Sequence, residues 1–325
     1  MGAAAGKSRN MRATVFGASG FIGSHVVEEL CKAGHGVNAV VRSPASRQLL
    51  EGFGARVMVV DYGDGAQIQA AMRGSDVVYN CIASTGTAAQ AEDPEAEIGL
   101  TRRLAHTASA LGVGHFVQLS SIVLYGFERS GAIDESYQPL IEYPIQRIQQ
   151  RREEIVTREV PGRQGVAVEA AGTALTILRP ASVIGSRGER SFFANLYRLN
   201  QSGRFPIVGK GQARGSFIDA RDLGRAMVFI GEHGISGTYL VKGFDASWSE
   251  LKASMDEATG THDACISIPA GLSNEGIDAS PLNPYEYRSF ATTRIWDDST
   301  IREAGFRPHY SLGQAVRSEI GYLER

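Results

Sequence analysis

The chain has 325 residues, an apolar fraction of 43% and a formal net charge of −2. This length allows a large buried core, and the near-neutral charge argues against a polyanionic partner such as nucleic acid. No run approaches the eighteen apolar residues of a membrane-spanning helix. The chain also offers no paired Cys or His spacing for a metal site, and its three cysteines, Cys31, Cys81 and Cys265, lie far apart. Three widely spaced cysteines favour a reducing, cytoplasmic environment over a disulfide framework.

Residues 1–10 are small and polar, and we expect them to form a disordered leader. The most informative segment follows. A short apolar strand runs into Gly17, Gly20 and Gly23, and an amphipathic helix continues to Leu30 before a second strand at 36–42. In such a βαβ unit the first glycine permits a tight turn, the second lets the backbone approach a pyrophosphate, and the third lets the helix lie close to the strand. The pattern predicts a dinucleotide site at the N-terminus of the helix.

Strand and helix signals alternate through the first half of the chain. We expect helices at 46–52, 66–72, 94–111 and 143–158, and strands at 56–60, 76–83, 115–119 and 175–178. This alternation predicts an α/β fold with a doubly wound, Rossmann-type parallel sheet. The carboxyl ends of its strands form the ligand edge, which would hold Arg42, Asp61, the pair Ala83–Ser84 and the pair Ser120–Ser121.

The second half points to a smaller lobe. Residues 186–216 are rich in aromatic residues and arginine, the helix at 219–230 and the strand at 237–241 return to the main sheet, and two helices follow Ser247. We therefore assign 11–185 with 217–243 to an NADP-binding Rossmann domain. Residues 186–216 with 244–325 form a substrate-binding subdomain.

Several motifs together resemble the extended short-chain dehydrogenases/reductases, the group that includes nucleotide-sugar epimerases and dehydratases. They are Gly17–Gly23, Val60–Asp61, Asn80–Ala83, Leu119–Ser121 with Leu124–Gly126, Leu178–Gly185, Phe217–Leu223 and Ala304–Pro308. The resemblance implies a pyrophosphate contact from Ser19, Gly20, Phe21 and Ile22, an adenine contact from Asp61 and Tyr62, and a ribose contact from Ala83 and Ser84. It also implies a cofactor-side hydroxyl from Ser120 and a nicotinamide flank from Pro180, Ala181, Ser182 and Val183.

The residue that closes the second strand selects the nicotinamide cofactor. An acidic residue there binds the ribose 2′-hydroxyl, whereas an arginine suits a 2′-phosphate. Here the residue is Arg42, with Arg47 nearby and no acid before Glu51. Because a guanidinium matches a phosphate in charge and geometry, the sequence predicts NADP(H).

The catalytic pair of the resembled family is a Tyr with a Lys four residues later, and this lysine is absent. The five lysines of the chain are Lys7, Lys32, Lys210, Lys242 and Lys252. Two registers remain open. In one, Tyr143 and Arg147 replace the pair. In the other, Ile145 fills the tyrosine position without a catalytic role and Gln149 fills the lysine position, where its amide can hydrogen-bond the ribose. Pro144 favours the second register, since it places Tyr143 at or before the helix start.

Ser121 is left to orient a carbonyl, because an isolated serine hydroxyl is a poor proton donor at neutral pH. The chain is similar to the atypical ketoreductases that tailor angucyclinone antibiotics. This resemblance implies an NADPH-dependent ketoreductase with a small aromatic substrate that could supply its own phenolic proton. The alternatives are an epimerase or dehydratase that uses Tyr143 and Arg147, and a non-catalytic NADPH sensor. The sequence leaves the oligomeric state open.

Overall fold

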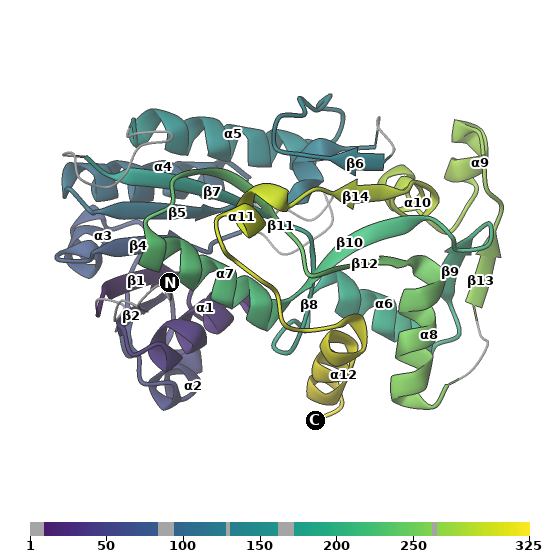
Figure 1. The fold of residues 1–325 in the computed structure, drawn as a ribbon, viewed down its shortest axis with the longest axis horizontal. Coiled ribbons are helices and arrows are strands. Elements are labelled where there is room, and N and C mark those ends of the chain that lie inside the picture. The colour runs from purple at the N-terminus through teal and green to yellow at the C-terminus, as the bar shows by residue number, and fades with distance from the viewer. Residues whose placement is uncertain (1–9, 84–93, 128–130, 162–171, 262–264) are drawn as a thin grey trace, which may run out of the picture.

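A seven-stranded parallel sheet forms the larger part of the molecule (Figure 1). The computed structural model describes residues 10–83, 94–127, 131–161, 172–261 and 265–325. The strand order is β11-β7-β5-β4-β1-β2-β3. Their bounds are β1 Arg12–Phe16, β2 Gly36–Val41, β3 Arg56–Val59, β4 Val77–Asn80, β5 His115–Leu119, β7 Ala174–Pro180 and β11 Gly237–Val241. This is the predicted doubly wound α/β sheet, with the order reversing beside β1 as a dinucleotide crevice requires.

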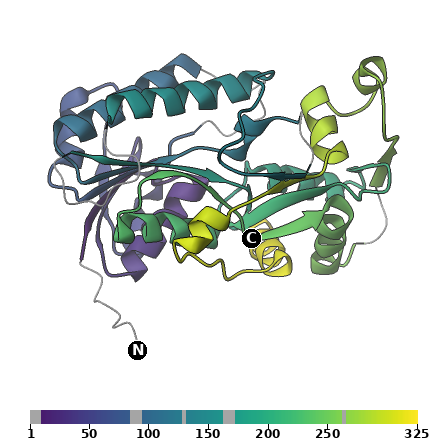
Figure 2. The same cartoon turned by 45° about the horizontal axis from the view of Figure 1, so that its top comes forward.

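Helices cover both faces of the sheet (Figures 1 and 2). One face carries α1 (Phe21–Lys32), α2 (Arg47–Gly52, after the 3-10 turn η1 at Pro44–Ser46) and α7 (Ala220–His233). The other face carries α3 (Gly65–Met72), α4 (Pro94–Ala110) and α5 (Pro144–Glu159). Each helix buries one apolar stripe against the strands, as Leu100, Leu104 and Ala108 do on α4. Two separate apolar cores result, one on each side of the sheet.

A second lobe adjoins the sheet at the right of Figure 1. It holds a five-stranded sheet in the order β12-β10-β14-β6, with β8 beside β10, and a two-stranded sheet β13-β9. The strands are β6 Gly131–Ile133, β8 Ser182–Ile184, β9 Phe205–Val208, β10 Arg214–Asp219, β12 Phe244–Ser247, β13 Cys265–Ile268 and β14 Arg294–Trp296. The helices of this lobe are α6 Phe192–Gln201, α8 Trp248–Thr259, α9 Asn274–Asp278, α10 Pro284–Ala291 and α12 Leu312–Leu323. The short helix α11 Ser299–Glu303 packs instead against β11 of the main sheet. Aromatic rings form much of the core, with Phe193, Phe205, Phe217, Trp248 and Phe290 buried.

The region after Ser247 differs from the prediction of two helices, because its described residues form five helices and two strands. The extra helices are short and depend on local capping rather than on a long apolar stripe. Asn283 caps α10, whose first residue is Pro284, and Ser273 caps α9. The strand predicted at 76–83 is also shorter. Its chain leaves the sheet after Asn80, whose Oδ1 accepts the amide of Ile82 at 3.2 Å.

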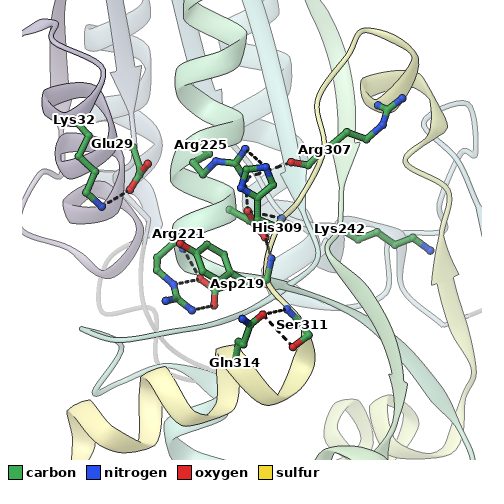
Figure 3. Close-up of polar contacts among 12 residues, drawn as sticks. Glu29, Lys32, Asp219, Arg221, Arg225, Lys242, Arg307, His309, Ser311 and Gln314 are labelled. Carbon is green, nitrogen blue, oxygen red and sulfur yellow. Dashed lines mark hydrogen bonds and ion pairs between the residues drawn. The ribbon is translucent and has the colours of Figure 1, made fainter.

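The segment before α12 is fixed to α7 by polar contacts (Figure 3). The buried carboxylate of Asp222 accepts the backbone amides of His309 and Tyr310, each at 2.9 Å to Oδ2. Arg225 Nη2 lies 2.9 Å from His309 Nε2, and the Arg221 guanidinium stacks 3.6 Å from the Tyr310 ring centre. These contacts hold the C-terminal helix of the second lobe against a helix of the main sheet.

Within the described ranges, no helix has both the length and the apolar character needed to span a bilayer.

Candidate functional site: the carboxyl edge of the parallel sheet

The glycine turn has the geometry that a phosphate site needs. Gly17 has φ +75°, and a Cβ on Gly23 would lie 2.1 Å from the Gly17 carbonyl oxygen, so α1 starts in backbone contact with the turn. Gly20 is the N-cap of α1 and gives it no side-chain cap. No side chain that the structure describes caps the first-turn amides of α1, so these amides are left for a ligand, and the turn fits a pyrophosphate in the space that side chains would fill. Ser19 is exposed here, and Phe21 and Ile22 are half-buried.

The Tyr62 hydroxyl joins the glycine turn to β2 at this edge. It accepts the Gly17 amide at 3.4 Å and donates to the Val40 carbonyl at 3.3 Å. Burial raises the pKa of this phenol, so it stays protonated and keeps both contacts at neutral pH. Asp61 is exposed and closes a local turn, because its Oδ1 accepts the Gly63 amide at 2.8 Å.

Arg42 follows β2 directly, so the parallel ladder places it on the same edge as the glycine turn. Its side chain is exposed and has no hydrogen bond or ion pair with any residue that the structure describes. The neighbouring Arg47 differs, since its Nη1 binds Glu51 at 2.8 Å. Arg42 is thus the cation of this pair that is free to meet a ligand.

The two serines after β5 have different partners. Ser120 is buried, and its hydroxyl donates to Glu153 Oε1 at 2.5 Å. Ser121 is half-buried, and its Oγ accepts the Val123 amide at 3.2 Å as the N-cap of the 3-10 turn η2 (Ile122–Tyr125). Among the described residues the Ser121 hydroxyl proton has no acceptor. The Ser121 hydroxyl can therefore still donate a hydrogen bond to a ligand, whereas the Ser120 hydroxyl already donates to Glu153.

Glu153 on α5 organises the groups behind these serines. Its carboxylate forms a double ion pair with Arg179 of β7, with Nε–Oε1 at 3.0 Å and Nη2–Oε2 at 2.6 Å. Arg179 Nη1 also donates to the Tyr125 hydroxyl at 2.6 Å. Burial raises the pKa of Tyr125 to about 12, so this phenol remains neutral.

The candidate catalytic positions on helix α5 differ in how far they are buried. Tyr143 is the N-cap and Ile145 lies in the first turn, both half-buried. Arg147 is exposed and its Nη2 approaches the Glu142 carbonyl at 3.5 Å. Gln149 is buried, and its Oε1 accepts from Nη1 of the buried Arg152 at 3.0 Å.

An aromatic cluster of Phe127, Tyr143 and Tyr285 packs at the start of α5. All three rings meet edge-on, with centroids 4.9 to 5.8 Å apart. Arg294 of β14 lies 4.0 Å from the Phe127 ring centre and donates to the Gly126 carbonyl at 2.8 Å. Since Tyr285 and Arg294 come from the second lobe, the cluster joins that lobe to the edge that carries Ser121.

The segment predicted to flank the nicotinamide passes from one sheet to the other. Pro180 ends β7 in the main sheet, Ala181 is buried, and Ser182 and Val183 open β8, which pairs with β10 in the second sheet. Ala83, three residues after the end of β4, is exposed. Ser84 and residues 1–9 of the predicted leader lie outside the described residues.

Glu319 on α12 was not singled out by the sequence analysis. Its buried carboxyl group accepts the Gly185 amide at 2.8 Å and the Ser191 hydroxyl at 2.7 Å. Burial raises its pKa to about 8. A Cβ on Gly188 would lie 3.0 Å from Phe21 Cζ and 3.1 Å from Glu319 Oε1, so the loop after β8 runs between α12 and the start of α1.

Comparisons with known proteins agree with this architecture. A protein of Escherichia coli K12, the uncharacterized protein YbjS, is 30% identical over 180 residues, which cover 54% of this chain and 51% of YbjS. A ketoreductase of 4-hydroxy-2-methyl-3-oxo-4-farnesyl-3,4-dihydroquinoline-1-oxide from Stigmatella aurantiaca is 24% identical over 233 residues, 70% of this chain and 66% of that protein. The chain thus matches about half of YbjS and just under two thirds of the ketoreductase.

Solved structures show the same fold across both lobes. The UDP-glucuronic acid 4-epimerase from Bacillus cereus in complex with NAD has a TM-score of 0.75 at 20% identity, covering 97% of this chain and 99% of that chain. MoeE5 in complex with UDP-glucuronic acid and NAD has a TM-score of 0.76 at 21% identity with the same coverage. The model of the NAD dependent epimerase/dehydratase family matches residues 13–241, which include the glycine turn, both serines and α5. The chain therefore belongs to the NAD-dependent epimerase/dehydratase family.

Proposed function

We propose that the protein is an NADPH-dependent ketoreductase that reduces a carbonyl of an aromatic, angucyclinone-like polyketide in antibiotic biosynthesis, within the cytoplasm. The observation that carries this proposal is the difference between the two serines. Ser120 gives its proton to Glu153, whereas the Ser121 proton has no acceptor among the described residues. A hydroxyl with a free proton on the ligand edge can donate to a carbonyl oxygen and polarise the carbonyl.

The cofactor assignment rests on the glycine turn and on Arg42. The turn leaves the first-turn amides of α1 for a pyrophosphate. The guanidinium of Arg42, which pairs with no residue in the described ranges, favours a ribose 2′-phosphate, and thus NADPH over NADH. When bound, NADPH supplies the hydride for the carbonyl carbon.

The proton must reach the new alkoxide without the family's tyrosine and lysine. Ile145 carries no proton, and a serine alone is a weak acid at neutral pH. We propose that a phenol beside the carbonyl of the substrate gives the proton while Ser121 holds the carbonyl oxygen. The ketoreductase from Stigmatella aurantiaca lends support to ketone reduction by this kind of chain.

The aromatic cluster supports a flat aromatic substrate. Tyr143 and Tyr285 stand at the junction of α5 with the second lobe, beside Phe127. Aromatic rings pack edge-on or offset against a planar guest and add to its burial. In this proposal Tyr143 contacts the substrate by packing, and its hydroxyl is dispensable.

A second candidate is an epimerase or dehydratase of nucleotide sugars, which the named activity of the solved relatives favours. It would use Tyr143 as the base with Arg147 in the lysine position. Arg147 is exposed and turned toward the Glu142 carbonyl, which weighs against a contact with a cofactor. A non-catalytic NADPH-binding protein is the third candidate.

One experiment separates the three candidates. The protein is mixed with NADPH and a panel of polycyclic ketones, each offered with a free phenol beside the carbonyl and with that phenol methylated, and NADPH absorbance is followed. We expect consumption only with the free phenols, unchanged in Tyr143→Phe and strongly reduced in Ser121→Ala. Loss of activity in Tyr143→Phe would favour the epimerase-like register, and tight NADPH binding without consumption would favour the sensor.

A further inference from the structure

We infer that Arg152 is a positioning residue for the cofactor: it fixes the side-chain amide of Gln149 so that the amide nitrogen, not the oxygen, faces the nicotinamide ribose. This inference rests on the proposed function in one respect only, the assignment of Gln149 to the family's lysine position. It explains how a chain without that lysine keeps a hydrogen-bond donor at the same place.

Every nitrogen of the Arg152 guanidinium has a partner inside the protein. The side chain is 1% exposed. Its Nη1 donates to Gln149 Oε1 at 3.0 Å and lies 3.2 Å from Glu97 Oε1. Its Nη2 donates to the Ile82 carbonyl at 2.5 Å, and its Nε to Thr101 Oγ1 at 3.4 Å. Because its partners come from α4, α5 and the loop after β4, the guanidinium is held in one place.

This fixed guanidinium decides which way the Gln149 amide points. A guanidinium only donates, so it can accept neither of the two N–H groups of an amide. Turning the amide over would bring its NH₂ group against Arg152 and leave donors unpaired in a buried place, which is costly. The oxygen of Gln149 is therefore held by Arg152. Its Nε2 has no hydrogen-bond partner among the described residues, while Gln149 as a whole residue is 8% exposed.

The contact with Ile82 links this arrangement to the ligand edge. Ile82 follows the end of β4, and its neighbour Ala83 is the exposed residue that the resemblance places beside the ribose. Arg152 thus joins the carbonyl of that loop to the amide of Gln149 across 2.5 and 3.0 Å contacts. An amide nitrogen oriented from this position can donate to a ribose hydroxyl, as the lysine of the family does.

Arg152 and glutamine also form a matched pair. A lysine at 149 would place an ammonium group beside the Arg152 guanidinium, and two like charges in a buried site repel each other strongly. With Arg152 in place, a neutral donor such as glutamine is favoured. The substitution of the family's lysine and the presence of the buried arginine are therefore two parts of one arrangement.

The test measures cofactor binding without any ketone, so it is independent of the proposed reaction. Two ligands are titrated: NADPH, and adenosine 2′,5′-bisphosphate, which lacks the nicotinamide riboside. Gln149→Leu removes the donor. Arg152→Met is made together with Glu97→Gln, because Arg152→Met alone would remove the ion pair that Arg152 forms with the Glu97 carboxylate. We expect each change to weaken NADPH binding on the order of tenfold and to leave binding of the bisphosphate unchanged. The variant that combines Gln149→Leu with Arg152→Met and Glu97→Gln should bind NADPH no more weakly than either parent variant. Each parent variant already removes the same contact, the hydrogen bond from the Gln149 amide to the ribose.

A rescue experiment tests whether the charge of Arg152 is what disfavours a lysine at position 149. Gln149→Lys alone should bind NADPH poorly, whereas Gln149→Lys in the Arg152→Met, Glu97→Gln background should recover most of the affinity because the like charge is gone. A purely structural role for Arg152 would predict equal losses for both ligands and no rescue, and either result would overturn the inference. If the arginine variants do not fold, Gln149→Lys and Gln149→Leu still decide it: equal NADPH affinity of Gln149→Lys and the wild type would refute the matched pair. A failure of the ketone assay would leave these binding results intact.

Discussion

The contact between Gly23 and the turn of Gly17 makes a quantitative prediction for Gly23→Ala. The added Cβ would lie 2.1 Å from the Gly17 carbonyl oxygen and 2.8 Å from its carbonyl carbon. Ordinary contact begins at 3.4 Å, so the helix and the turn must separate by roughly 1.3 Å. Both groups are backbone atoms of well-packed elements, and such overpacking costs about 1–3 kcal/mol. The higher helix propensity of alanine returns at most about 1 kcal/mol.

We therefore expect Gly23→Ala to lower the free energy of unfolding by about 1–2 kcal/mol, measured by urea denaturation. NADPH affinity should fall by about tenfold or more, because the amides of the turn move away from the pyrophosphate. The matched control is Gly321→Ala, a helical glycine of α12 whose added Cβ meets no atom within 4 Å. That variant should gain about 0.5–1 kcal/mol and bind NADPH normally. If both variants unfold at the same urea concentration and bind NADPH equally, the close approach at Gly23 is not required.

Three further results are expected. Arg42→Asp should raise the KM for NADPH about 10- to 100-fold and leave the KM for NADH nearly unchanged. The control Arg47→Asp should change neither KM, since Arg47 already pairs with Glu51. Equal effects of Arg42→Asp on both cofactors would contradict a 2′-phosphate contact. Ser121→Ala should lower kcat with little change in NADPH affinity, and Ser120→Ala should have the smaller effect on kcat; the reverse order would exclude Ser121 as the carbonyl donor. The pKa of Glu319 is raised to about 8, so its contribution to stability is complete below pH 4.5 and is lost as the pH rises through 8. Glu319→Gln should remove this decline, compared as urea midpoints at pH 5.5 and 8.5, and an unchanged decline would refute it.

Much of the larger sheet follows from local patterns in the sequence. The strand, the glycines and the helix from Thr14 to Leu30 specify their own geometry, because the turn needs a left-handed residue and the helix needs a close approach. The parallel ladders then bring Arg42 and Ser121 to the same edge as the glycines. The places of Arg42 and Ser121 on this edge were predictable, because the sequence pattern of each strand and the residue at which it ends are local properties.

The contacts that distinguish the site are not local. Ser120 and Glu153 lie on different elements, and nothing in their spacing shows that one takes the proton of the other. Arg152 reads in the sequence as one more charged residue of an amphipathic helix, yet it is buried and bound to the Ile82 carbonyl. The short helices after Ser247 were missed for a related reason, since each has too few residues to show a period.

The pairing of β6 with β14 has a consequence for synthesis of the protein on the ribosome. Gly131 lies opposite Arg294, about half of this chain away, so this ladder cannot form until Arg294 has left the ribosome. The strands β1 to β5 and their helices emerge earlier and can fold as they appear, since domains generally fold N-terminal part first. We expect the nascent chain to pass through a stage in which the nucleotide edge is built and its cover is not. At that stage a bound dinucleotide would protect the exposed edge, and we expect aggregation during expression to fall when the cofactor pool is high.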